Sequence, residues 1–345
     1  MGKPDSIRKY GGAARHLVIA ALLNFLLVVA LVAQDPTKIA GSDACQECHE
    51  AAYQVLEATK HQSSYRTFHT QDEARAILER LELRSARRAF CVDCHYTSQQ
   101  AEGRRTARTI SGVSCESCHS PAADWLDIHN NYGRDASGQR ATRETETPDH
   151  RASRLEEGAR LGMIRPDQPY ALAQNCFQCH TVAREELVNT GEHAAGSDFE
   201  LVSRLRGEVR HNFQLSNDEE NRDAARDYDP TNRNRVLYVL GQMLDLEYAL
   251  RGLADATTSG TYAQAMEDRA TASMGRLQAI QTSAPVIAPA IQQILDAAGQ
   301  SDFAPNNNAA LVAAADRIRT AAQAFVAEHD GSALGALDQL VPSND

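Results

Sequence analysis

Several features of nucleotide-dependent and hydrolytic enzymes are missing from this 345-residue sequence. It contains no Gly-rich phosphate-binding loop, no dinucleotide-binding fingerprint and no pattern of a catalytic triad. Aromatic residues are scarce, at 6% of the chain, and Trp125 is the single tryptophan. Basic residues are also outnumbered by acidic ones: the chain has 35 Lys and Arg and 46 Asp and Glu, which gives a formal net charge of −11. This balance argues against a nucleic-acid-binding function and favours a basic docking partner.

The amino terminus carries an apolar run that is longer than a usual signal-peptide core and just short of a clear membrane span. Four basic residues precede Leu17–Ala33, which is apolar apart from Asn24. Residues 1–34 are therefore predicted to be either a cleaved signal peptide or a membrane anchor. In both cases the rest of the chain is expected in the periplasm or on the extracytoplasmic face of the membrane. No cysteine lies near the end of the run, which argues against a lipoprotein anchor.

Cysteine is absent outside four short motifs of the pattern CxxCH. They are Cys45-x-x-Cys48-His49, Cys91-x-x-Cys94-His95, Cys115-x-x-Cys118-His119 and Cys176-x-x-Cys179-His180. On one helical turn the two thiols and the imidazole of such a motif project to the same side. This pattern is typical of covalent haem attachment, in which the thiols form thioethers and the histidine binds the iron. The sequence thus predicts four haem c groups, whose own apolar surface fits the scarcity of aromatic side chains.

Zinc ribbons and disulfides account for less of this pattern than haem attachment does. Zinc ribbons also use CxxC pairs, but they have no reason to place a histidine directly after every second cysteine. A disulfide framework would leave the four identically placed histidines without a role.

Further histidines are candidates for the opposite faces of the irons. They are His61, His69, His129, His193 and His211. His150 lies in the polar stretch 130–160, which we expect to be a surface loop, so a solvent-exposed side chain is expected there.

The overall pattern predicts a mainly α-helical protein with little regular β structure. Helices are expected at about residues 50–68 and 73–89 in a haem-packed tetrahaem domain at 40–215. A charged linker at 216–230 then leads to an Ala-rich domain at 231–345. Apolar residues from Val236 to Leu253 recur at helical spacing, and further helices are expected at about 262–281, 285–298 and 307–327. Together these predict an antiparallel helical bundle with a structural role, through which a homo-oligomer could form.

Several stretches resemble the multihaem cytochrome c-554 family of periplasmic electron carriers. They are CQECHEAAYQVLEATKH, GVSCESCHSPAADWLDIH and CFQCHT with GEHAAGSDFEL and GEVRHNF. The likeness covers about residues 40–215 and excludes the carboxy-terminal helices. It implies that the four motif histidines are proximal ligands.

The resemblance also implies partners for these ligands. His61 would serve the third haem, His129 the first, and His193 or His211 the fourth. The family's second haem keeps one face open. This chain offers more histidines, His69 among them, so the sequence leaves five- or six-coordination of the second haem undecided.

The sequence therefore favours an electron carrier over an enzyme, one that relays electrons between redox protein partners through closely packed haems. One alternative is a membrane tetrahaem quinol dehydrogenase, because only eleven residues separate Ala33 from Cys45. Another is a reductase of a small nitrogen oxide at an open haem face. A high-spin ferric signal that responds to nitric oxide would distinguish the latter.

Overall fold

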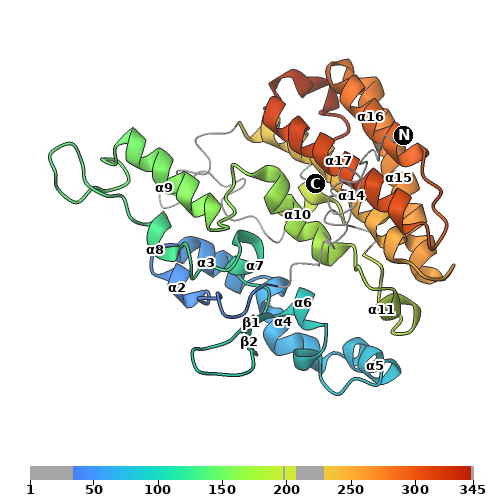
Figure 1. Cartoon of the computed structure of the whole chain (residues 1–345), viewed down its shortest axis with the longest axis horizontal. Helices are drawn as coiled ribbons and strands as arrows, with labels where there is room; N and C mark the ends of the chain where they lie inside the picture. Colours follow the sequence, from blue (N-terminus) through green and yellow to red (C-terminus); the bar gives the residue numbers. More distant parts are fainter. Residues whose placement is uncertain (1–33, 197–198, 207–228, 343–345) are drawn as a thin grey trace, which may run out of the picture. The chain divides into compact units, whose positions relative to one another are not determined.

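The structure is a computed structural model that describes residues 34–196, 199–206 and 229–342 (Figure 1). From Gln34 onward the chain forms one compact unit. The predicted signal or anchor, His211 and nearly all of the charged linker lie outside the described residues. Within them, no helix has both the length and the apolar character needed to cross a membrane.

The amino-terminal half consists of short helices joined by turns, and the predicted mainly α fold is confirmed. The elements are α2 (Asp43–Gln46), α3 (Glu50–Glu57), α4 (Lys60–Thr67), η1 (Phe68–Thr70), α5 (Asp72–Arg80), η2 (Ala86–Arg88), α6 (Val92–His95), α7 (Cys115–His119), α8 (Leu126–His129), α9 (Pro148–Arg160), α10 (Pro169–His180), α11 (Glu185–Asn189) and α12 (Leu201–Arg206). Three of the CxxCH histidines, His95, His119 and His180, are the last residues of their helices. This placement puts the second, third and fourth motifs on the final turn of a helix, whereas His49 of the first motif directly precedes α3.

The two helices predicted before the second motif are both interrupted. The first divides into α3 and α4 because Thr59 takes an extended conformation, and its hydroxyl accepts a hydrogen bond from the Gln62 N–H as an N-cap. The second ends at Arg80, and Glu82 follows with a positive φ of 54°. Thr and Glu at these positions gave no breaker signal as strong as glycine or proline.

Among the described residues, regular β structure is limited to one small antiparallel sheet. Strands β1 (Thr97–Gln99) and β2 (Arg108–Ser111) form a hairpin between the second and third motifs. The buried Thr97 hydroxyl donates to the Gly112 carbonyl at 2.8 Å. A Cβ at Gly112 would lie 2.3 Å from the His61 carbonyl oxygen, so only glycine allows the hairpin to meet α4 this closely.

The stretch 130–160, predicted to be a surface loop, contains a full helix in its second half. Helix α9 begins after Thr147, whose hydroxyl accepts from the His150 N–H, and it has a proline in its first turn. Both features are standard helix starts. The prediction was wrong for Pro148–Arg160 because the polar composition masked these signals.

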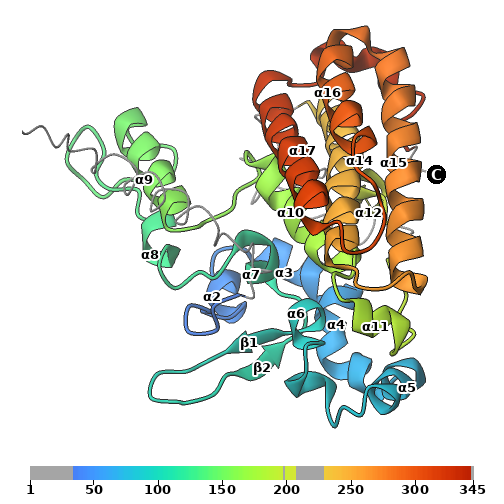
Figure 2. The same ribbon diagram turned by 45° about the vertical axis from the view of Figure 1, so that its right-hand side comes forward.

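The carboxy-terminal residues form the predicted helical bundle (Figure 2). Its elements are α14 (Pro230–Asp255), α15 (Thr261–Ser283), η4 (Pro285–Ile287), α16 (Ala288–Gly299), α17 (Asn308–Glu328) and η5 (Ser332–Leu337). Helix α14 is buried well beyond the one apolar face that was predicted, since Leu237, Leu244 and Ala249 are buried too. The reason is that α15, α17, α10 and α12 all contact it.

One apolar core extends from the bundle into the region of the fourth motif. Tyr170, Ala173 and Phe177 of α10 belong to the same buried cluster as the bundle's leucines. The Tyr170 hydroxyl donates to the Glu247 carboxylate of α14 at 2.7 Å. The division into a tetrahaem domain and a separate carboxy-terminal domain stays a prediction, but the two regions share this core.

Candidate functional site

The fold brings the four CxxCH motifs together in two pairs. The thiols of Cys45 and Cys115 are hydrogen-bonded, which joins the first motif to the third and lowers the pKa of Cys115 to about 7. The thiols of Cys94 and Cys179 are likewise in contact, joining the second motif to the fourth. The two motifs of each pair are therefore neighbours in space, although 70 positions separate Cys45 from Cys115 and 85 separate Cys94 from Cys179.

His129 lies opposite the histidine of the first motif. The ring centroids of His49 and His129 are 6.3 Å apart, with planes inclined by 26°. His129 is the last residue of α8, and the Trp125 ring meets it edge-on at 5.3 Å. This pair is the one that the resemblance implies.

His193 lies opposite the histidine of the second motif. The ring centroids of His95 and His193 are 6.3 Å apart, with planes inclined by 56°. The Phe68 ring stacks on His95 at 3.9 Å. Both histidines line a cavity of about 300 Å³, together with Phe68, Ile77 and Lys60.

His61 lies beside the histidine of the fourth motif. The ring centroids of His61 and His180 are 6.1 Å apart, with planes inclined by 84°. This differs from the resemblance, which assigns His61 to the third haem. The backbone of His61 does contact the third motif, because its carbonyl accepts from the Val113 N–H at 3.0 Å. Its ring points instead toward the fourth.

The three spacings fit a shared metal ion. A bond from a metal to an imidazole nitrogen is about 2 Å long, and that nitrogen lies about 1.1 Å from the centre of its ring. Two imidazoles on opposite sides of one metal therefore have ring centroids about 6 Å apart. The observed values of 6.3, 6.3 and 6.1 Å match this requirement. Haem iron with two axial histidines is therefore compatible with the side chains as they lie.

The charge state of the rings also suits metal binding. Burial, together with the nearby imidazoles of His193 and His61, lowers the pKa of His95 to about 4. Burial and the His61 imidazole lower the pKa of His180 to about 4 as well. At neutral pH both rings are therefore neutral, which is the form that binds a metal.

Backbone carbonyls fix the orientation of three histidine rings, those of His119, His129 and His193. The Nδ1 atoms of His119, His129 and His193 lie 2.8, 2.5 and 2.6 Å from the carbonyl oxygens of Ile164, Leu126 and Ala194. A carbonyl oxygen can only accept, so Nδ1 carries the proton and Nε2 keeps its lone pair. This second contact is typical of metal-binding histidines.

The third motif is held by contacts from two directions. The Ile164 N–H donates to the His119 carbonyl at 3.1 Å, and the Asn175 amide of α10 donates to the Cys118 carbonyl at 2.7 Å. Glu116, between the two cysteines, is 1% exposed and accepts from the backbone N–H groups of Ala40, Gly41 and Ala122, each at 2.8 Å. Sequence reasoning missed Glu116, since it occupies a variable position of the motif.

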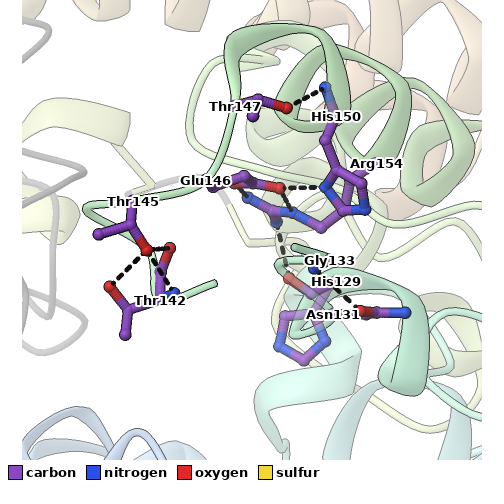
Figure 3. Close-up of polar contacts among 9 residues, drawn as sticks. All are labelled: His129, Asn131, Gly133, Thr142, Thr145, Glu146, Thr147, His150 and Arg154. Carbon is purple, nitrogen blue, oxygen red and sulfur yellow. Dashed lines mark hydrogen bonds and ion pairs between the residues drawn. The ribbon is translucent and has the colours of Figure 1, made fainter. Parts of the chain in front are cut away.

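Sequence reasoning also missed an ion-paired clamp behind His129 (Figure 3). The Arg154 guanidinium donates to both carboxylate oxygens of Glu146, at 2.7 and 2.6 Å, and to the His129 carbonyl at 2.7 Å. His150, expected in solvent, contacts the same carboxylate through Nδ1 at 2.7 Å and is half-buried. The capping pattern of α9 was the available signal for this arrangement.

All the predicted haem ligands remain predictions, including His69 and His211. His69 lies in η1, and its buried Nδ1 has no hydrogen-bond partner within the described part of the chain. His211 lies outside the described residues.

A zinc ribbon would need four ligands round one point. Residues 34–196, 199–206 and 229–342 contain no group of three or more His, Cys, Asp or Glu arranged to hold a metal ion.

Comparison with known proteins gives two matches. Residues 44–120 match the family model described as cytochrome c554 and c-prime. A protein of Nitrosomonas europaea named cytochrome c-554 is 25% identical over 174 residues, which cover 48% of this chain and 66% of the relative. No solved structure matches. The resemblance that the motifs predict is thereby confirmed.

Proposed function

We propose that this chain, which is similar to the cytochrome c-554 family, is an exported electron carrier with four covalently bound haem c groups. It would accept electrons from one redox protein and pass them to another in the periplasm. The family match supports a c-type cytochrome; the haem count, the location and the relay are our proposal.

The eight motif cysteines would hold the haem groups through thioether bonds. His49, His95, His119 and His180 would bind the four irons on one face. His129, His193 and His61 would bind the first, second and fourth on the other face. When bound, haem c supplies an iron that changes between two oxidation states.

The paired histidines carry the proposal. Two imidazoles at fixed positions keep the same coordination in both oxidation states, so little rearrangement accompanies the gain or loss of an electron. The 6.3 Å spacing of His95 and His193 places a side chain on each side of the second site. A small-molecule reaction at the second site would require His193 to leave, which favours the carrier over a nitrogen-oxide reductase that uses this site.

The pairing of the motifs supports a relay. Thiol contacts between Cys45 and Cys115, and between Cys94 and Cys179, bring the sites of two motifs together in each case. Transfer between cofactors falls steeply with distance, so neighbouring attachment sites are what a relay requires.

Substitution of His129 tests the assignment, with His329→Ala as the control, because the His329 ring packs on Phe325 of the carboxy-terminal bundle. In His129→Ala one low-spin haem should become high-spin in the electron paramagnetic resonance (EPR) spectrum, while the intact mass still shows four attached haem groups. His329→Ala should keep the wild-type spectrum. An unchanged spectrum for His129→Ala would remove this residue from the ligands.

A further inference from the structure

A buried arginine of the carboxy-terminal bundle reaches into the region of the haem motifs. Arg269 of α15 is 5% exposed and forms an ion pair with Asp245 of α14 through Nε. Its Nη1 donates to the backbone carbonyl of Gly196 at 2.5 Å. Its Nη2 is buried and has no hydrogen-bond partner among the residues that the structure describes. The Arg269 side chain thus joins the bundle core to residues 190–196, which follow α11.

Residues on either side of Gly196, among those that the structure describes, contact two proposed iron sites. His193 faces His95, and Phe199 stacks on the His180 ring at 4.3 Å. Gly196 has a positive φ of 70°, and a Cβ there would lie 1.8 Å from the His180 carbonyl oxygen. A displacement of Gly196 would therefore affect the partner of His95 and the surroundings of His180 together.

The geometry of its guanidinium group allows Arg269 to hold the Gly196 backbone at a fixed position relative to Asp245 of α14. Asp245 is itself fixed, because its second oxygen accepts from the Ser273 hydroxyl at 2.7 Å and pairs with Arg276 at 3.0 Å. A planar guanidinium donates in two fixed directions, one to Asp245 and one to Gly196. A lysine ammonium is a compact donor that cannot bridge the same two acceptors in the same way.

The bundle also forms hydrogen bonds with α11, the helix just before these residues. The Asn189 side-chain oxygen of α11 accepts from the Tyr262 N–H at 2.8 Å. The Glu185 carboxylate accepts from the backbone N–H groups of Thr257 and Thr258 at 2.9 and 3.1 Å. On the other side, Arg80 of α5 donates to the Gly191 carbonyl at 3.1 Å. The segment is held between α5 and the bundle.

We infer that Arg269 is a positioning residue through which the carboxy-terminal bundle sets the His193 and His180 iron sites. The inference rests on the proposed function, because both histidines act there as haem ligands. It gives the bundle a part in the redox chemistry beyond the structural role that the sequence predicted.

Arg269→Gln and Arg269→Lys test the inference in the full-length protein after haem attachment, with Arg235→Gln as the control. Arg235 of α14 likewise donates to a carboxylate, that of Asp338 at 2.6 Å, and to a backbone carbonyl, that of Gly331 at 3.3 Å, but these partners belong to the carboxy-terminal bundle. Both Arg269 variants should convert part of the low-spin EPR signal to high-spin and shift the midpoint potential of at least one haem. Added imidazole should restore the low-spin signal. Arg235→Gln should keep the wild-type spectrum and potentials.

Gly196→Ala provides an independent route that leaves the bundle core intact, in case the Arg269 variants fail to fold. Its methyl group would displace the same segment, so the same spectral change is expected. Wild-type spectra and potentials in Gly196→Ala and in folded Arg269 variants, with four haem groups attached, would overturn the inference while the proposed function stands. A wild-type protein without haem would instead refute the proposed function.

Discussion

The carboxy-terminal bundle and the region of the first three motifs are held together in different ways. In the bundle, apolar side chains of α14 to α17 form a large continuous core. Around the second motif, the buried cluster within the described residues is small, with Ala86, Cys91 and Tyr96 at its centre. Polar side chains bound to backbone groups, such as Glu116 and Arg154, connect much of the rest.

The proposed cofactors give a physical reason for this difference. A region that binds several macrocycles needs fewer apolar side chains, because each haem brings apolar surface into the interior. The bundle has no CxxCH motif and must fill its core from its own sequence. Cofactor attachment should therefore stabilise the two regions to different extents.

The largest contrast is expected when the chain is made without haem attachment. Helices α3 to α9 should then lose hydrogen-exchange protection by roughly tenfold or more, because they lack a core of their own. Helices α14 to α17 should keep most of theirs. Hydrogen exchange read out by peptide mass would show this, and equal losses in both regions would contradict the comparison.

A cavity in the bundle should lower stability strongly. Leu250→Ala removes a fully buried side chain of α14 and is expected to reduce the free energy of unfolding by about 2–5 kcal/mol. Val286→Ala, at a side chain that is 55% exposed, is the control and should change it by less than about 0.5 kcal/mol. Denaturant unfolding followed by circular dichroism measures both; equal effects would mean that the apolar core does not dominate here.

The buried carboxylate of the third motif should matter more than the exposed carboxylate of the first. Glu116→Gln replaces an acceptor of three backbone N–H groups by an amide that cannot satisfy all of them, at a cost of roughly 1–3 kcal/mol. Glu47→Gln changes the exposed glutamate between Cys45 and Cys48 and should be nearly neutral. Thermal unfolding of the two variants gives the comparison. A neutral Glu116→Gln would refute the role of polar anchors in this region.

A smaller, pH-dependent effect is expected where α11 meets the bundle. Partial burial opposes the charge of Glu185, but hydrogen bonds from Thr258 and Thr257 outweigh it and lower the pKa of Glu185 to about 2. The stabilisation is therefore complete above the ordinary pKa of 4.5 and is lost as the pH falls from there toward 2. Glu185→Gln should lower the melting temperature at pH 7 and make little difference near pH 2. A difference independent of pH would contradict this.

The sequence predicted the fold class and the bundle helices well because both depend on local patterns. Helical spacing from Val236 to Leu253 marked α14, and the CxxCH spacing marked the histidines that we propose as proximal ligands. The break at Thr59 and the start of α9 were missed, since a single capping side chain decided each against the surrounding composition.

The proposed distal histidines were harder to assign from sequence, because their partners depend on long-range packing. His61 lies twelve residues after His49 but faces His180, 119 positions away. Arg154 and Arg269 act through backbone carbonyls, and no side-chain pattern records such contacts. From sequence alone, charged residues on polar helices are predicted to be solvent-exposed, because the packing around them is not yet known.

Haem content and spin state of the purified, oxidised wild-type protein are the sharpest test of the proposed haem sites. We expect four covalently attached haem groups per chain in the intact mass, with at least three low-spin signals in the EPR spectrum from the His49–His129, His95–His193 and His61–His180 sites. A colourless protein, zinc in place of haem iron, or a spectrum dominated by high-spin iron would contradict this expectation.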